Sequence, residues 1–262
     1  MTRVKAGHQA PPQTSAMENA NPHRRLMACL DLTQLGDSDT PRDIQALCSL
    51  AARLPVAPAA LCVHPEMVAS AHAGLERVGL PAVLVATVVN FPDGAEDPAR
   101  CRREILRARG AGAQEIDAVL PWRALLAGDA DAVVASLRAM REASHGLTLK
   151  VIIESGELGS TAHIREASLM AIHEGADFIK TSTGKARVHA TPEAAEAMLV
   201  AIAETGGRCG FKAAGGIRTP QQAGEYLAIA DRVLGPVWCR PARLRIGASS
   251  LAEALLSPPG GP

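Results

Sequence analysis

Short apolar runs alternate with longer amphipathic segments from residue 26 to residue 256. The runs have the length of strands and are rich in Val, Ile, Leu and Ala, which is typical of strands buried on both faces of a parallel sheet. They predict strands over about 26–33, 60–64, 82–89, 115–120, 147–154 and 176–180, a seventh strand ending at 212, and an eighth over 244–250 with its loop.

Capping residues mark the helix starts between these runs. Thr40-Pro41, Thr191-Pro192 and Thr219-Pro220 each place a threonine N-cap before a proline at the first helical position. Glycines end several of the segments, as they commonly end helices. The pattern predicts helices over about 40–53, 65–79, 97–112, 129–144, 160–175 and 191–206, and one beginning at 219.

Eight strands alternating with helices indicate an α/β protein with a parallel sheet, and the count of eight favours a single (β/α)₈ TIM barrel. A doubly wound open sheet is the structural alternative. We expect one catalytic domain over residues 26–256. A flexible tail over 1–25 should precede it, and a disordered tail over 257–262 should follow, because its prolines and glycines prevent regular structure.

Composition excludes several classes of function. The 262 residues carry a formal net charge of zero and only 2% aromatic residues, which disfavours binding to nucleic acid or to an anionic membrane. No apolar run reaches the ~18 residues of a membrane span, and the first 25 residues lack the apolar segment of a secretory signal. The six cysteines form no C-x-x-C pair and the histidines show no metal-binding spacing. We therefore expect buried thiols, a cytoplasmic location and no metal.

The candidate chemistry starts with two lysines. Lys180 ends a short apolar strand within the stretch GADFIKTSTGK, and Lys212 ends the next strand before Gly215 and Gly216. A buried ammonium is costly without partners, and a desolvated lysine can act as an amine nucleophile, although a lysine at a strand end can also extend to water. Two such lysines on adjacent strands would converge. The second charge would favour the neutral amine of the first near neutral pH.

Other polar residues are expected at the same ends of the strands, where barrel active sites form. Asp117 is the best candidate for proton transfer beside a Schiff base, and Glu115 should share its face of the strand. The remaining candidates keep structural alternatives. Asp31 could pair with a lysine, Lys150 could form an ion pair with Glu154, and Cys62 could be a core thiol.

Glycine-rich segments follow the last three predicted strands. They are Gly184-Lys185, Gly215-Gly216-Ile217-Arg218 and Gly247-Ala248-Ser249-Ser250. Glycines allow backbone N–H groups to approach an anion, and barrels often bind phosphate with the loops after strands seven and eight. We expect these segments to hold a phosphate group. The residues together predict a Schiff-base enzyme acting on a small phosphorylated carbonyl compound.

Several motifs closely resemble deoxyribose-phosphate aldolase over about residues 26–256. They are KVIIESGE from residue 150, GADFIKTSTGK from 175, GFKAAGGIR from 210 and GASS from 247, together with DLT from 31, NFP from 90 and EIDAV from 115. The resemblance implies a metal-independent class I aldolase without a cofactor. Its implied reaction is the reversible cleavage of 2-deoxy-D-ribose 5-phosphate to D-glyceraldehyde 3-phosphate and acetaldehyde, in deoxyribose phosphate catabolism.

The resemblance also implies roles for single residues. Lys180 matches the Schiff-base lysine, Lys212 the second lysine that assists proton transfer, and Asp117 the acid–base carboxylate. Cys62 matches a cysteine close to the substrate. The phosphate-binding positions match Gly184, Lys185, Gly215, Gly216, Gly247 and Ser249. The implied partners are the phosphorylated sugar and the aldehydes, and the family's usual assembly is a homodimer or a monomer.

Two departures from the family pattern stand out. Ala213 replaces a proline after the second lysine, which predicts a looser loop there. The chain's single tyrosine is Tyr226, so a protonation step assisted by a terminal tyrosine is expected to be absent. Two other functions stay open: a Schiff-base aldolase for another phosphorylated sugar, and a catalytically silent barrel that only binds sugar phosphates.

Overall fold

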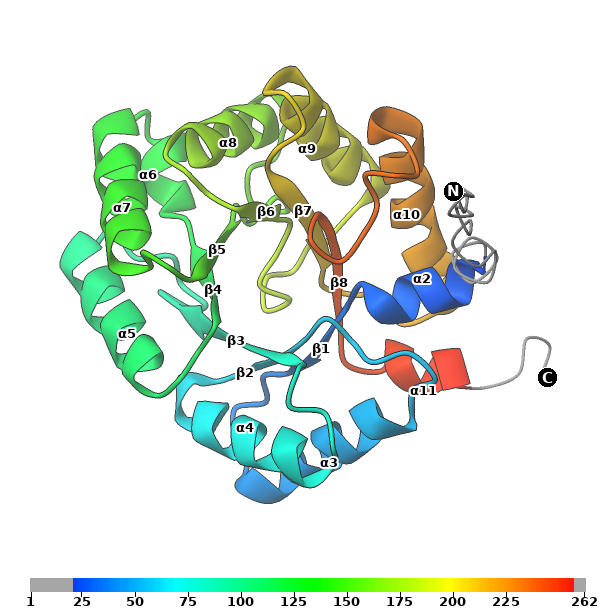
Figure 1. The fold of residues 1–262 in the computed structure, drawn as a ribbon. Coiled ribbons are helices and arrows are strands. Elements are labelled where there is room, and N and C mark those ends of the chain that lie inside the picture. Colours follow the sequence, from blue (N-terminus) through cyan, green and yellow to red (C-terminus); the bar gives the residue numbers. More distant parts are fainter. Residues whose placement is uncertain (1–20, 257–262) are drawn as a thin grey trace, which may run out of the picture.

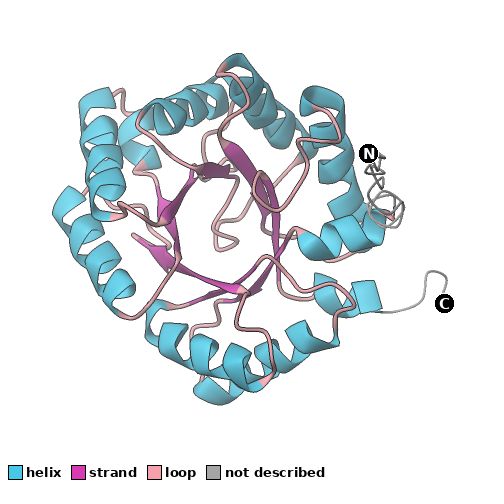
Figure 2. Ribbon diagram, viewed as in Figure 1, coloured by secondary structure: helices cyan, strands magenta, loops and turns pink. Residues whose placement is uncertain are grey.

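Eight parallel strands form a closed barrel, and helices surround it (Figures 1 and 2). The computed structural model describes residues 21–256. Each strand pairs with the next along the chain, and the last strand pairs with the first. This closure confirms the predicted TIM barrel and excludes the open-sheet alternative.

The strands are short and the helices longer, in the expected order. The strands are β1 (Leu30–Gln34), β2 (Ala60–Val63), β3 (Leu84–Val89), β4 (Glu115–Val119), β5 (Thr148–Ile152), β6 (Phe178–Lys180), β7 (Gly210–Ala214) and β8 (Leu244–Ala248). The described helices are α2 (Pro22–Ala28), α3 (Pro41–Arg53), α4 (Val68–Arg77), α5 (Pro98–Gly110), α6 (Trp122–Leu126), α7 (Ala130–Ala143), α8 (Thr161–His173), α9 (Pro192–Glu204), α10 (Pro220–Leu234) and α11 (Leu251–Leu256), with a 3₁₀ turn η1 (Pro65–Met67).

The helix starts follow the capping signals of the sequence. Thr40 and Thr219 form capping boxes with Asp43 and Gln222, respectively. In each box the threonine side chain accepts a hydrogen bond from the backbone N–H of the partner, and the partner's side chain accepts one from the backbone N–H of the threonine. Thr191 accepts a hydrogen bond from the backbone N–H of residue 194. These caps fix where each helix leaves the loop above the barrel, and so they set the loop lengths on that face.

Apolar and charged side chains occupy different layers of the fold. The large apolar core lies between the strands and the helices. Inside the barrel, Ala60, Cys62, Ala86 and Val88 of β2 and β3 form a separate small apolar cluster. Most of the remaining interior is occupied by long charged side chains from the other strands, described below, together with the ring of Phe178. The hydrophobic stabilisation therefore comes mainly from the outer layer.

The N-terminal boundary differs from the prediction. The apolar residues Leu26 and Met27 belong to the buried face of α2, which Asn21 caps, and β1 begins only at Leu30. The predicted tail over residues 1–25 therefore ends inside a helix. This helix packs against α10, and Arg25 forms an ion pair with Asp231 of α10 at 2.8 Å.

Parts of the predicted organisation fall beyond what the structure describes. Residues 1–20 and the predicted C-terminal tail, 257–262, lie outside the described residues. Within residues 21–256, every helix is too short or too polar to cross a lipid bilayer.

Gly210 provides a test of packing in the barrel interior. A Cβ at this position of β7 would overlap the Phe178 ring, which is buried beside it. We expect Gly210→Ala to lower the free energy of unfolding by about 1–3 kcal/mol through overpacking. The matched control is Gly224→Ala in α10, where a Cβ meets no atom within 4 Å. That variant should be stabilised by about 0.5–1 kcal/mol because helical glycine is unfavourable. Urea unfolding measures both, and equal stability of the two variants would contradict the packing argument.

Candidate active site

Seven charged side chains form a buried cluster inside the barrel. They come from β1 and from β4 to β8, and all are less than 7% exposed. The basic members are Lys150, Lys180, Lys212 and Arg245, and the acidic members are Asp31, Glu115 and Asp117. Strand register brings them together. Asp117 pairs with Lys150, and Lys212 pairs with both Lys180 and Arg245 on the strands beside it. Glu115 lies two residues before Asp117 and therefore on the same face of β4.

Asp117 is the centre of this cluster. Its Oδ2 atom accepts hydrogen bonds from Lys180 Nζ at 2.8 Å and from Lys212 Nζ at 2.7 Å. Its Oδ1 atom accepts one from Lys150 Nζ at 2.8 Å. Lys180 and Lys212 are direct neighbours in the register of β6 and β7, as the spacing of their strands predicted. One carboxylate thus connects three amines from three adjacent strands.

Arg245 is a member of the cluster that the sequence analysis missed. Its guanidinium donates to Asp31 at 2.6 Å and to Glu115 at 2.8 Å. Glu115 also contacts Lys150 Nζ at 2.6 Å, and Asp31 contacts Lys212 Nζ at 2.6 Å. Alternation along β8 could have revealed it, because Arg245 lies two residues before Gly247 and therefore faces the same side.

The cluster shifts the pKa values of its members in opposite directions. Burial alone would raise the pKa of Asp31 and Asp117, but the surrounding cations outweigh burial and hold both pKa values below the ordinary range. Burial alone would lower the pKa of Lys150 and Lys212, but the neighbouring carboxylates raise both above the usual value. All four groups are therefore held in their charged forms.

Cys62 lies against the cluster without sharing its charge. Its Sγ is 4.0 Å from Asp117 Oδ2, and the side chain is fully buried. Burial is the main cause that raises its pKa, so the group stays a thiol. This position matches the core-thiol interpretation, with Cys62 directly beneath the proposed acid–base carboxylate.

A cavity of about 370 Å³ opens at the carboxyl ends of the strands. Lys180 is the cluster member that lines it. The three predicted glycine-rich segments line it too, and they contribute Gly184, Lys185, Gly215, Gly216, Ile217, Arg218, Gly247, Ser249 and Ser250. The candidate nucleophile and the candidate phosphate-binding segments therefore share one cavity. Asp31 and Cys62 lie beneath it, among the buried groups.

Close backbone approach explains two of the glycines. A Cβ at residue 247 would lie 3.0 Å from the Cε atom of Lys212, so a side chain there would displace the second lysine by a few tenths of an ångström. Gly216 has a φ of +75°, in the left-handed region that favours glycine. Both glycines thus serve the geometry of the site directly.

Glu154 holds the loop after β6 in place. Its carboxylate accepts hydrogen bonds from the backbone N–H and the hydroxyl group of Thr183. Burial raises the pKa of Glu154, against the effect of these hydrogen bonds. The suggested ion pair between Lys150 and Glu154 is wrong, because Glu154 has a φ of +52° that turns its chain away from the strand pattern. Thr181 adds a second tie, donating to the Ala214 carbonyl oxygen at 3.0 Å.

Two residues near the cavity, Asp37 and His189, were not predicted. Lys185 Nζ forms an exposed ion pair with Asp37 Oδ1 at 2.8 Å, which links the loop after β6 to the loop after β1. His189 lines the cavity beside Gly215 and Gly216, and its buried Nδ1 atom has no hydrogen-bond partner among the described residues. Proximity of a loop histidine to glycines of the next loop carries no signal in the sequence.

The structure shows where the two departures from the family pattern lie. Ala213 lies inside β7 and pairs with Ile246 of β8, so the expected loosening of a loop at this position is wrong. Tyr226 is buried on α10, on the outside of the barrel, and does not line the cavity.

Comparisons with known proteins agree with this barrel fold. An apo crystal structure of a candidate deoxyribose-phosphate aldolase from Toxoplasma gondii is 26% identical, with a TM-score of 0.82, covering 91% of this chain and 96% of that one. A candidate deoxyribose-phosphate aldolase from Coccidioides immitis is 29% identical, with a TM-score of 0.75 and coverage of 88% and 85%. The deoxyribose phosphate aldolase from Aeropyrum pernix, described as tetrameric, shares the fold at 24% identity and a TM-score of 0.71, covering 94% and 97%.

The chain is an aldolase by family. The model of the DeoC/LacD family of aldolases matches residues 25–233, which is most of the described barrel. The protein belongs to this DeoC/LacD family.

The charge cluster predicts how stability depends on pH. The depressed pKa values of Asp31 and Asp117 contribute stability above about pH 4, the unfolded-state value, and this contribution is lost as pH falls below it. The raised pKa values of Lys150 and Lys212 contribute below about pH 10.4, and this is lost as pH rises further. We expect a broad plateau between these limits in urea unfolding followed against pH.

A pair of variants tests whether the cluster causes the loss of stability at acid pH, the acid limb of the profile. Asp31→Asn should lower the free energy of unfolding by about 3–5 kcal/mol on the plateau and flatten the loss at acid pH, since it breaks a buried pair. Asp129→Asn, which changes an exposed N-cap to an equivalent one, should leave the acid limb unchanged. Identical pH profiles for both variants would show that the cluster does not cause the acid limb.

Proposed function

We propose that the protein is a class I aldolase that reversibly cleaves 2-deoxy-D-ribose 5-phosphate to D-glyceraldehyde 3-phosphate and acetaldehyde, in the catabolism of deoxyribose phosphates. One observation carries the proposal. Lys180 lines the cavity shared with the glycine-rich segments, and it shares the Oδ2 atom of Asp117 with Lys212. A nucleophile, a proton carrier and a place for a phosphate group thus occur together.

The charge balance of the cluster supports Lys180 as the nucleophile. Four basic groups face three carboxylates, so one proton can be lost without leaving a net negative charge. Lys150 contacts three carboxylates and Lys212 two, whereas Lys180 contacts only Asp117. Arginine does not lose its proton in proteins. Lys180 therefore has the fewest carboxylate partners of the three lysines, and it is the one that lines the cavity, where a substrate carbonyl group can reach it.

The reaction then proceeds through a Schiff base. Neutral Lys180 attacks the C1 aldehyde of the open-chain sugar, and loss of water gives a protonated imine. Removal of the C3 hydroxyl proton breaks the C2–C3 bond and releases glyceraldehyde 3-phosphate, while the imine accepts the electron pair and becomes an enamine. Protonation of the enamine carbon and hydrolysis release acetaldehyde and restore the amine.

Asp117 is suited to carry protons because its charge environment changes during this cycle. In the free enzyme three ammonium groups hold its pKa low. When Lys180 becomes a neutral enamine, one of these positive charges is gone, which favours the protonated carboxyl group. Asp117 can then deliver a proton, directly or through a water molecule, and Lys212 stays beside it as a permanent cation.

The other end of the cavity supports a phosphorylated substrate. Gly215 and Gly216 offer backbone N–H groups without side chains in the way, and Ser249 and Ser250 add hydroxyl groups. Lys185 can exchange its exposed partner Asp37 for a phosphate oxygen, since surface ion pairs contribute little. Phosphate binding would fix the distance between the C1 aldehyde and Lys180.

Reductive trapping tests the nucleophile. Acetaldehyde and borohydride should leave an ethyl group on Lys180, and Lys180→Ala should abolish both this adduct and cleavage of 2-deoxyribose 5-phosphate. The assignment is unusually clear here because the chain has only five lysines, at 5, 150, 180, 185 and 212. Mass spectrometry of the digested protein locates the adduct. An adduct on Lys185 or Lys5 instead, with Lys180 unmodified, would overturn the mechanism.

A variant of the carboxylate separates binding from proton transfer. Asp117→Asn should lower kcat by about 10²–10⁴-fold, the usual contribution of a positioned acid–base group. Steady-state assays with 2-deoxyribose 5-phosphate and with other phosphorylated sugars measure this loss and the substrate preference together. Faster cleavage of another phosphorylated sugar would keep the Schiff base but replace the proposed substrate.

A variant of Lys185 tests the phosphate end. Lys185→Gln should raise the KM for 2-deoxyribose 5-phosphate by about tenfold, as expected for loss of one hydrogen bond to a charged group. It should leave the slower cleavage of unphosphorylated 2-deoxyribose unchanged. An equal effect on both substrates would exclude a contact between Lys185 and the phosphate.

A further inference from the structure

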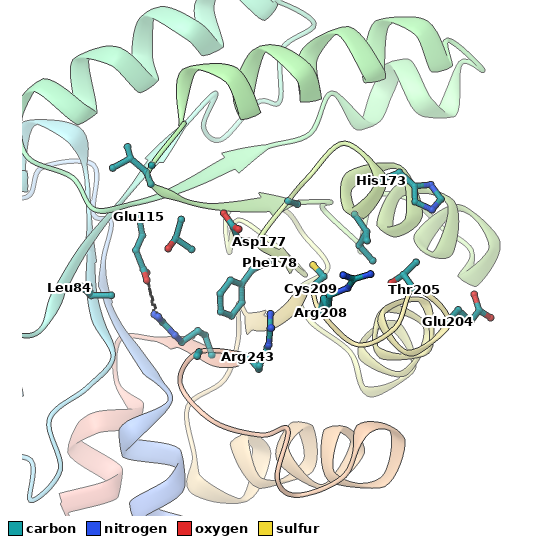
Figure 3. Close-up of a pocket in the computed structure, with 17 residues that line it drawn as sticks. Leu84, Glu115, His173, Asp177, Phe178, Glu204, Thr205, Arg208, Cys209 and Arg243 are labelled. Atoms are coloured by element: carbon teal, nitrogen blue, oxygen red, sulfur yellow. Dashed lines mark hydrogen bonds and ion pairs between the residues drawn. The ribbon is translucent and has the colours of Figure 1, made fainter.

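A second cavity lies at the opposite mouth of the barrel. Its volume is about 1040 Å³, and it is lined by the amino ends of β3 to β8 and the loops that lead into them (Figure 3). The proposed aldolase reaction needs nothing from this end, because Lys180 and the glycine-rich segments open at the other mouth.

Two arginines at this cavity have no side-chain partner in the part of the chain that the structure describes. Arg208 and Arg243 both line it, and neither side chain forms a hydrogen bond or an ion pair with any residue in 21–256. Arg208 is exposed and Arg243 is half-buried. Unpaired arginines beside a cavity are well suited to bind phosphate or carboxylate groups, because each guanidinium presents a planar set of donors.

The acidic groups at the cavity are already engaged with other cations. Glu115 binds Arg245 and Lys150, while Asp177 binds Arg141 at 2.8 Å and Glu204 binds Arg165 at 2.7 Å. They therefore do not neutralise Arg208 and Arg243. The lining holds three arginines and three acidic side chains, and Arg208 and Arg243 are the two of these arginines that form no ion pair within residues 21–256.

The floor of the cavity is rigid and partly apolar. Arg245 lies 5.5 Å from the centre of the Phe178 ring and is held by Glu115 and Asp31. In the view of Figure 3, the Phe178 ring lies between the Glu115 carboxylate and the guanidinium groups of Arg208 and Arg243. A ligand could thus place a carbon skeleton against Phe178 while its anionic groups contact the two arginines.

We propose that this cavity is a second binding site, for a small organic anion with two or more phosphate or carboxylate groups. Arg208 and Arg243 supply the charge that selects it. The cavity is far larger than a single phosphate ion, so the ligand is a metabolite-sized polyanion. The inference is independent of the proposed reaction, because it concerns the other face of the barrel and is tested by binding.

Titration of the full-length protein with pyrophosphate and with citrate, at constant ionic strength, tests the proposal. Calorimetry gives the affinity, and backbone amide chemical shifts give the location. We expect saturable binding of at least one probe, with shifts at Thr205, Cys209 and Arg243. Comparison of the two probes shows whether phosphate or carboxylate groups are preferred.

Variants assign the binding to the two arginines. Arg208→Gln combined with Arg243→Gln should weaken binding at this face by about tenfold or more, as expected for loss of charge-assisted contacts. Since neither side chain has a partner, the double variant should fold normally. The control is Arg42→Gln combined with Arg53→Gln, which removes the same two charges from exposed arginines of α3 that do not line the cavity.

Three outcomes would overturn the proposal. One is the absence of saturable binding by either probe. Another is a set of shifts confined to Gly215, Gly216, Ser249 and Ser250, which would place the anion at the other mouth. The third is an equal loss of affinity in the Arg208/Arg243 variant and in the Arg42/Arg53 control, which would show attraction by overall charge only.

Discussion

The carboxylate of Asp117, buried among three lysine amines, is the constraint on which the rest of the structure depends. A single buried charge would be prohibitively costly, so each member of the cluster requires the others in place. This requirement explains why the interior of the barrel is mostly polar from β4 to β8, with only a small apolar cluster at β2 and β3. The hydrophobic stabilisation is left to the layer between strands and helices.

Hydrogen bonds and close packing also fix the loops at the carboxyl ends of the strands. Glu154 and Thr181 tie the loop after β6 to its neighbours, and Gly247 leaves room for Lys212 to reach Asp117. The amine and the glycine-rich segments are therefore held by strands and short hydrogen-bonded turns. Such an arrangement suits a site that must hold a reacting group and a proton carrier in a fixed geometry.

Much of this architecture could be predicted from periodicity. Strand and helix runs gave the barrel, and alternation placed Glu115 with Asp117 on one face, because both patterns depend only on local geometry. Arg245 and His189 were missed because their roles depend on which strands and loops become neighbours when the barrel closes. The helix over residues 22–28 was missed because the apolar pair at 26 and 27 continues smoothly into β1. A local pattern cannot separate a helix from a strand over so few residues.

The cluster also bears on how the chain acquires its structure. Its members are spread from Asp31 on the first strand to Arg245 on the last, and these two form a direct ion pair. Until β8 emerges and pairs with β1, the growing chain contains two carboxylates, Asp31 and Glu115, that lack their shared guanidinium. A seven-stranded intermediate would have to hydrate these groups and could not close around them. Synthesis of β8 should therefore act as the step that commits the nascent chain to its native state, and barrels truncated before Arg245 should remain open to proteolysis.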